Sequence, residues 1–144
     1  MQPRTMYDER LLTPMRRDLT EVGFTELRTA DEVDQALIEK PGTAMVLVNS
    51  VCGCSARMAR PAARIAVTHD PRPEHFYTVF AGQDAEATEK ARGYFTGYPP
   101  SSPSIAILRD GKLVWMLERW QIEGRPAEEI AEDLVAAFDE HCGN

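Results

Sequence analysis

The sequence predicts an α/β fold in which helices flank both faces of a mixed central β-sheet. Segments with helical and strand patterns alternate along most of the chain, which is typical of this class. Residues 44–48 form an unbroken apolar run, as expected of a central strand that is covered on both faces. The pair Asp110-Gly111 is a strong hairpin signal, so it predicts an antiparallel strand in the same sheet.

The first elements follow from apolar spacing and from residues that stop helices. A helix is expected within residues 6–22, because apolar residues recur there every three or four positions, although Pro14 should end or kink its first turn. A short extended piece at 24–28 follows. Thr29 and the acidic residues after it then predict the start of a second helix, which should stop at residues 40–42, before the apolar strand.

The second half of the chain continues the alternation. After the central strand, residues 49–54 lead into a predicted helix at 55–67 that Pro61 should kink. The remaining predicted elements are strands at 75–81, 104–108 and 112–117, helices at 84–95 and from about 126 to 142, and a Pro/Ser loop at 97–103.

Length and composition indicate one soluble globular domain over residues 1–144. A chain of this length can bury a core without disulfides or metals, and its 43% hydrophobic and 27% charged residues are ordinary for a globular protein. No stretch reaches transmembrane length, and the first ten residues lack the apolar core of a secretory signal. We therefore expect a cytoplasmic protein with no membrane partner, and the oligomeric state stays open.

Charge and cysteine content narrow the function classes. With 23 acidic against 16 basic residues, the formal net charge of −7 argues against binding to nucleic acid. Three cysteines in a chain without an export signal point to reduced, metal-binding or catalytic thiols. Two of them, Cys52 and Cys54, are separated only by Gly53.

The cysteine pair straddles a predicted strand-to-helix turn, and this place favours thiol chemistry. The N-terminus of a helix stabilises a thiolate through unpaired backbone N–H groups and the positive end of the helix dipole. We therefore expect Cys52 to be the nucleophile, with a pKa below the ~8.5 of a free thiol. Gly53 lets the backbone turn sharply, and Cys54 is the nearest sulfur that could resolve a mixed disulfide.

A second element is the sequence Ser101-Ser102-Pro103-Ser104, which immediately precedes a predicted strand. Thioredoxins carry a cis-proline at this place, and the residue before it presents its backbone to a bound extended substrate. Ser102-Pro103 is the candidate for this cis bond; an ordinary trans loop proline is the alternative.

These motifs together resemble the bacilliredoxin family, whose members have a thioredoxin-like fold and a Cys-Gly-Cys active site. The resemblance covers nearly the whole chain and rests on residues 14–17, 48–54, 59–63, 79–84, 94–97 and 101–104. It implies that Cys52 attacks mixed disulfides between bacillithiol and client protein cysteines and takes the bacillithiol onto itself. The partners would be S-thiolated clients, with bacillithiol as the thiol co-substrate and no tightly bound cofactor or metal.

Substrate contacts are expected around the motif. Beside the two cysteines, the candidates are Ser50, Gly53, Arg57, Arg60, Ser102 and Pro103. Arg57, Arg60 and Arg64 recur at helical spacing, so they form either a solvated face or a cationic face for the carboxylates of the malate group of bacillithiol.

Several alternatives remain open at this point. The cysteine pair could be structural, or it could bind a metal together with His69, His75 or Cys142. Cys142 is otherwise expected to be a partly buried terminal thiol or an intermolecular partner, and His69 a surface residue or proton carrier. The tryptophans, Trp115 and Trp120, are expected to pack in the core. Rival functions are a general protein disulfide isomerase or reductase, a metal-binding module, and a non-catalytic adaptor.

Overall fold

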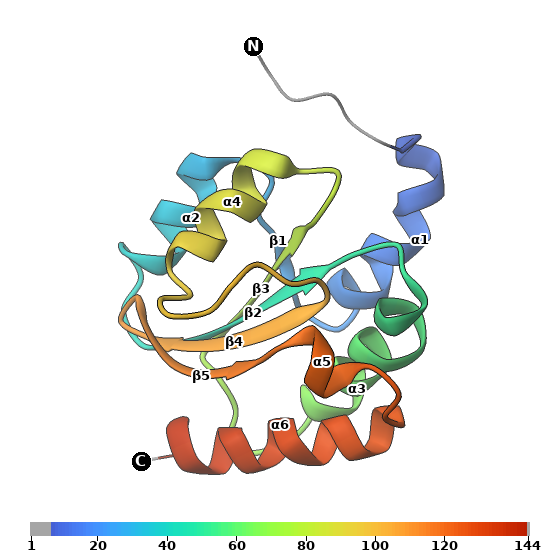
Figure 1. The fold of residues 1–144 in the computed structure, drawn as a ribbon. Coiled ribbons are helices and arrows are strands. Elements are labelled where there is room, and N and C mark those ends of the chain that lie inside the picture. The colour runs from blue at the N-terminus through green and yellow to red at the C-terminus, as the bar shows by residue number, and fades with distance from the viewer. Residues whose placement is uncertain (1–6, 144) are drawn as a thin grey trace.

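The computed structural model describes residues 7–143, which contain a five-stranded mixed sheet (Figure 1). The strands are β1 (Thr25–Glu26), β2 (Thr43–Asn49), β3 (His75–Phe80), β4 (Ser104–Arg109) and β5 (Lys112–Leu117). Their spatial order is β1-β3-β2-β4-β5, so β2 is central. β3 is parallel to β1 and β2, whereas β4 is antiparallel to β2 and β5. The predicted mixed sheet is confirmed.

Helices cover both faces of this sheet, as predicted. They are α1 (Glu9–Thr20), α2 (Ala30–Leu37), the π-helical segment η1 (Ser55–Ala59), α3 (Arg60–Ala66), α4 (Ala85–Gly93), α5 (Arg119–Ile122) and α6 (Ala127–His141). α2 and α4 pack together on one face, while α3 and α6 pack together on the other with α1 beside α3 (Figure 1). No helix within residues 7–143 combines the length and apolar character that a membrane span requires.

The central strand connects two hydrophobic cores because its side chains alternate between the two faces of the sheet. Met45 and Leu47 belong to the core under α3 and α6, whereas Val46 and Val48 belong to the core under α2 and α4. All four side chains are fully buried. Burying each of them stabilises the fold by roughly 1.5–3 kcal/mol. This doubly buried strand provides a rigid base for the turn that follows it.

The hairpin between β4 and β5 forms at the predicted pair. Asp110 and Gly111 have φ angles of 51° and 79°, so both lie in the left-handed region that a type I′ turn requires. At Gly111 an added Cβ would also lie 2.9 Å from the Leu37 carbonyl oxygen. The turn reverses the chain and returns it along β5 toward the end of β2 from which the cysteine motif leaves.

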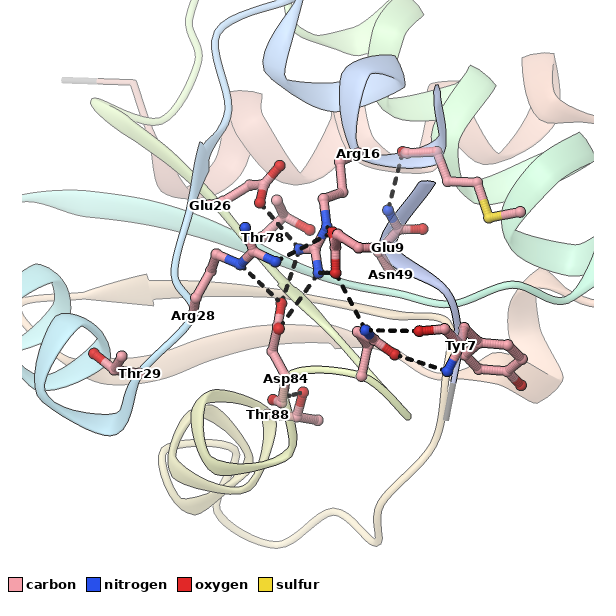
Figure 2. A network of polar contacts seen from close by, with 12 residues as sticks. Tyr7, Glu9, Arg16, Glu26, Arg28, Thr29, Asn49, Thr78, Asp84 and Thr88 are labelled. Atoms are coloured by element: carbon pink, nitrogen blue, oxygen red, sulfur yellow. Dashed lines mark hydrogen bonds and ion pairs between the residues drawn. The ribbon is translucent and has the colours of Figure 1, made fainter. Parts of the chain in front are cut away.

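An ion-pair cluster that no sequence pattern predicted anchors α1 to the sheet. Figure 2 shows the buried Arg16 guanidinium among three carboxylates. Its nitrogens lie 2.5 Å from Glu9, 3.0 Å from Glu26 and 2.8 Å from Asp84. Because these carboxylates come from α1, β1 and the residue before α4, the cluster fixes α1 relative to the rest of the fold.

Two prolines behave differently from a simple helix stop. Pro14 lies inside α1 without ending it. It is exposed, as is Arg10, whose carbonyl loses its helical donor at residue 14, so water can replace that donor. Pro61 is the second residue of α3 and is separated from η1 by Arg60, and the wider π-helical turn before it accommodates a residue that lacks an N–H. Residues 1–6 and 144 of the predicted domain, including Met6 of the predicted first helix, lie outside the described residues.

Candidate active site

Cys52 lies at the N-terminus of the helix that follows the central strand. Its carbonyl accepts hydrogen bonds from the backbone N–H groups of Ser55 and Ala56, both at 3.1 Å, so helical hydrogen bonding begins at this residue. The helical conformation then continues through η1 and α3. Cys52 therefore occupies the position whose side chain faces the unpaired N–H groups of the first turn, as the sequence predicted.

The Cys52 sulfur receives hydrogen bonds from several donors. The Ser50 hydroxyl oxygen lies 3.1 Å from it, and the backbone N–H groups of Ser55 and Cys54 lower its pKa as well. Partial burial raises the pKa of the Cys52 thiol. These hydrogen bonds and the positive charge of Arg119 outweigh that effect, so the pKa of Cys52 lies below its ordinary value. This direction agrees with the one that the sequence predicted.

Two serine hydroxyls form a short chain that ends at this sulfur. Ser55 Oγ is fully buried, lies 2.9 Å from Ser50 Oγ, and accepts the Ser50 backbone N–H at 3.1 Å. If Ser55 donates its single hydroxyl hydrogen to Ser50, the Ser50 hydrogen is free to point at Cys52. This arrangement leaves both hydroxyl hydrogens bonded in a region where an unmade bond is costly. Ser50 thus stabilises the nucleophile, and Ser55 orients Ser50.

The structure corrects the expected role of Arg60. Its side chain is buried rather than part of a solvent-facing row, with only 4% of its surface exposed. Nη1 donates to the Asn49 side-chain oxygen at 3.0 Å and to the Ser50 carbonyl at 3.1 Å, and Nε makes an ionic contact with Asp18 at 3.2 Å. The Asn49 amide in turn donates to the Met15 carbonyl (Figure 2). Arg60 therefore stabilises the turn through these buried contacts and is not placed to contact a ligand.

The other two arginines of the predicted row also separate. Arg57 is exposed, whereas Arg64 donates to the Asp18 carbonyl at 2.8 Å and lies 3.3 Å from the Glu21 carboxylate. Arg57 lies within the π-helical segment and Arg60 directly follows it, and the wider turn changes the angle at which successive side chains leave the helix. The prediction that Arg57, Arg60 and Arg64 share one helix face, which assumed regular helical spacing, is therefore wrong.

Cys54 has the opposite electrostatic environment from Cys52. Burial and the negative charge of the neighbouring thiolate raise the pKa of Cys54, Glu123 adds to this effect, and Arg119 opposes it. All three cysteines are free thiols in this structure. The arrangement thus favours ionisation of Cys52 before Cys54, because the pKa of the first thiol is lowered and that of the second is raised. Gly53, between them, is exposed, and an added Cβ would meet nothing within 4 Å.

The Ser102-Pro103 bond is cis, as predicted, and Pro103 is buried. The pairing of Val48 with Ser104 places this loop next to the end of β2, where the cysteine motif begins. Arg119, the first residue of α5, holds the loop. Its backbone N–H lies 3.4 Å from Ser101 Oγ, and its Nη1 donates to the Ser102 carbonyl at 3.0 Å.

Sequence reasoning missed α5, and with it Arg119. The helix has only four residues, too few for a periodic pattern, and its capping signal pairs Glu118 with Gln121 instead of starting with the usual serine or threonine. Ile122 anchors it in the core, whereas Trp120 is 71% exposed. The prediction that Trp120 packs in the core is therefore wrong; Trp115 does pack, partly buried, against the core.

The residues of the metal-site alternative do not converge on the cysteine pair. Thr43, which bonds the Cys142 thiol, begins β2, whereas Cys52 follows the end of that strand. A seven-residue strand separates the two ends by about 20 Å. His69 pairs with Asp139 at 2.8 Å, and His75 begins β3 at the Thr43 end of the sheet. Among residues 7–143, no group of three or more His, Cys, Asp or Glu side chains is arranged to hold a metal ion.

Comparisons with known proteins show the family and the fold of the chain. A family model described as disulphide isomerase matches residues 7–142. A bacilliredoxin of Koribacter versatilis is 57% identical over 138 residues, which are 96% of this chain and 95% of the relative. A bacilliredoxin of Geobacillus kaustophilus is 58% identical over 127 residues, which are 88% of this chain and 87% of that relative. Thioredoxin of Malassezia sympodialis has a TM-score of 0.60 at 15% identity, covering 84% of this chain and 92% of that one, so the fold is thioredoxin-like, as predicted.

Proposed function

The chain belongs to the bacilliredoxin family and is a thiol–disulfide oxidoreductase, and we propose that it removes bacillithiol from the cysteines of client proteins. The observation that carries this proposal is the Cys52 sulfur, which lies at a helix N-terminus and accepts a hydrogen bond from Ser50. A sulfur in this place is the nucleophile that disulfide exchange needs. We propose the cytoplasm as its location, because thiols stay reduced there.

The first step transfers the small thiol. The Cys52 thiolate attacks the bacillithiol sulfur of the mixed disulfide, and a new S–S bond forms between Cys52 and bacillithiol. The old S–S bond breaks, and the client sulfur leaves with the electron pair and takes a proton from solvent. No net oxidation occurs in this step, because one disulfide is exchanged for another.

The second step releases the adduct, and either of two thiols can perform it. If Cys54 attacks Cys52, bacillithiol leaves as a thiolate and an internal disulfide remains, which two external low-molecular-weight thiols then reduce. If an external thiol attacks the bacillithiol sulfur directly, Cys52 is regenerated in one exchange. Once Cys52 carries the adduct it is neutral, so one of the causes that raise the pKa of Cys54 disappears.

Mass spectrometry of single-cysteine variants tests the proposal. The protein is incubated with a bacillithiolated model protein, and the mass of each variant is followed. We expect Cys54→Ala to retain a stable bacillithiol adduct on Cys52 and Cys52→Ala to acquire none, while Cys142→Ala matches the unmodified sequence. Full activity of Cys52→Ala would contradict the proposal and would leave the adaptor alternative.

Two further alternatives have their own readouts. The description of the matching family model favours a general disulfide isomerase as the second candidate. That activity predicts efficient refolding of a protein with scrambled disulfides, at a rate comparable to removal of bacillithiol. A metal-binding module instead predicts stoichiometric zinc or copper in anaerobically purified protein, lost on Cys52→Ala substitution.

A further inference from the structure

We propose that Arg119 determines the substrate specificity of the thiol site: it favours a compact thiol adduct that carries a carboxylate and disfavours an extended peptide bound at Ser102. This inference rests on the proposed function and names the chemistry that the site selects. It differs from the sequence-based hypothesis, in which carboxylate binding by arginines of the motif helix was one of two alternatives.

Arg119 lies between the two parts of the site, the cysteine motif and the loop that contains Ser102-Pro103. It lies at the start of α5, where the chain leaves β5, and its side chain is 42% exposed. Two hydrogen bonds, to Ser101 and Ser102, fix it on the loop beside the cysteine motif. Its charge acts on both active-site sulfurs. The guanidinium is therefore both accessible to solvent and close to the reacting atoms.

The other arginines near the motif are less suited to this task. Arg60 is buried and occupied by protein acceptors, and Arg64 already pairs with Glu21. Arg57 is exposed, but its charge is not among the largest causes of the pKa shift of either sulfur. Arg119 has a carboxylate neighbour of its own, Glu123, at 3.7 Å, a contact long enough for a substrate carboxylate to compete with it.

The bond from Arg119 to Ser102 also bears on how a substrate docks. An extended peptide that pairs with the backbone before Pro103 would use the Ser102 carbonyl, and Arg119 already donates to that oxygen. Peptide pairing therefore competes with this charge-assisted hydrogen bond. A small thiol adduct needs only a sulfur within reach of Cys52, and its carboxylate matches the fork of guanidinium donors.

The test compares two small thiols on one carrier. A model protein with a single exposed cysteine is converted to its mixed disulfide with mercaptosuccinate, which carries two carboxylates, or with neutral 2-mercaptoethanol. We expect kcat/KM for the mercaptosuccinate adduct to be higher by about tenfold, as for one charge-assisted contact. Arg119→Gln should reduce this ratio to near one, and Arg119→Lys should keep part of it.

Using a ratio removes the effect of Arg119 on the nucleophile itself. A change in the reactivity of Cys52 alters both rates in one variant and cancels, whereas a lost carboxylate contact lowers only one rate. Arg57→Gln is the matched control, because it also removes an exposed arginine near Cys54 and should leave the ratio unchanged. Equal slowing of both adducts by Arg119→Gln would overturn the proposal, as would loss of the ratio in Arg57→Gln.

Two further arms complete the design. In the first arm, peptides with Glu or Gln next to a 2-mercaptoethanol-modified cysteine place the carboxylate on the client instead of the small thiol. If the protein prefers the Glu peptide but does not prefer the mercaptosuccinate adduct, Arg119 does not recognise a carboxylate of the small thiol. Arg119→Gln should also process a plain peptide disulfide faster relative to the 2-mercaptoethanol adduct, and an unchanged ratio would overturn the docking argument. Activity of Cys52→Ala on the bacillithiol adduct tests the proposed function separately.

Discussion

The Ser50 hydroxyl oxygen lies 3.1 Å from the Cys52 sulfur, and the chain makes this contact over only two residues at the turn that leaves β2. The buried strand fixes Ser50, and the start of the helix fixes Cys52, so the hydroxyl meets the sulfur without needing a mobile side chain. Ser55 Oγ, 2.9 Å from Ser50 Oγ, holds the hydroxyl in this direction from behind.

This contact predicts that Ser50→Ala raises the pKa of Cys52 and slows its reaction at neutral pH. A hydrogen bond to a charged group contributes about 1.5–3 kcal/mol, so the rate constant should fall by about tenfold or more. Ser55→Ala should shift the pKa in the same direction by a smaller amount, because the donor remains but loses its support. The pH dependence of thiol alkylation measures both effects.

Ser104→Ala is the matched control for the serine variants. Ser104 is also buried, but its hydroxyl donates to the Ser101 carbonyl at 3.0 Å and not to a sulfur. Its removal should leave the alkylation profile of Cys52 in place. Equal profiles for Ser50→Ala and the unmodified protein would show that the hydroxyl does not stabilise the thiolate.

Arg60 is predicted to be a stability residue. Replacing it with Gln removes the donor from the Asn49 side-chain oxygen and the Ser50 carbonyl and leaves them buried, so the free energy of unfolding should fall by roughly 2–4 kcal/mol. Arg64→Gln, on the same helix but 40% exposed, should change it by less than about 0.5 kcal/mol. Urea unfolding distinguishes the two, and similar losses would contradict the assignment.

The Arg16 cluster predicts a dependence of stability on acid pH. Burial raises the pKa of Glu9, whereas its hydrogen bonds and ion pairs with Arg16, Gln83 and Arg28 lower it. The lowering effects together are larger, so the pKa in the folded protein lies below 4.5. The unfolded chain therefore binds more protons near this pH, and the stability present above pH 4.5 is lost as pH falls through the folded value.

Arg16→Gln should thus cost about 3 kcal/mol at pH 7, by leaving three partly buried carboxylates without their partner, and should flatten the acid dependence. Arg10→Gln is its control, because Arg10 pairs with Asp8 on the surface with 90% of its side chain exposed. Unfolding followed at several pH values tests the pair of variants. If stability falls with acid pH as steeply in Arg16→Gln as in the unmodified protein, the Arg16 cluster is not the cause of that dependence.

Cys142 is predicted to be an unreactive thiol that takes no part in the exchange reaction. Burial raises the pKa of its thiol, with Glu74 adding to this and Thr43 and Arg109 opposing it. It should therefore react slowly with iodoacetamide at neutral pH, and Cys142→Ser should retain the exchange activity of the unmodified protein. Loss of activity in that variant would mean that the far end of β2 takes part in the reaction.

Much of the fold was predictable because it depends on local patterns. The apolar run of β2, the Asp110-Gly111 turn and the Thr29 capping box are each encoded within a few residues. The place of Cys52 was predictable for the same reason, since a strand pattern ends just before it and a helix pattern begins just after it.

What could not be predicted depends on contacts between distant segments or on irregular helix geometry. Arg16 meets Asp84 across 68 residues, and Arg119 meets Ser102 only after the β4–β5 hairpin has returned the chain. Arg60 was assigned to the wrong face because the sequence pattern assumed a regular helix where the chain forms η1. Ser50 was correctly placed in the site, but its contact with the sulfur required the three-dimensional turn.

The proposed reaction depends most directly on the charge state of the Cys52 sulfur. The rate of iodoacetamide alkylation, measured from pH 5 to 10 with each cysteine resolved by mass spectrometry, reports the pKa of all three thiols in one sample. We expect Cys52 to titrate below an ordinary thiol, with Cys54 and Cys142 above it. If Cys52 reacts no faster than a simple peptide thiol at pH 7, it is not the nucleophile described here.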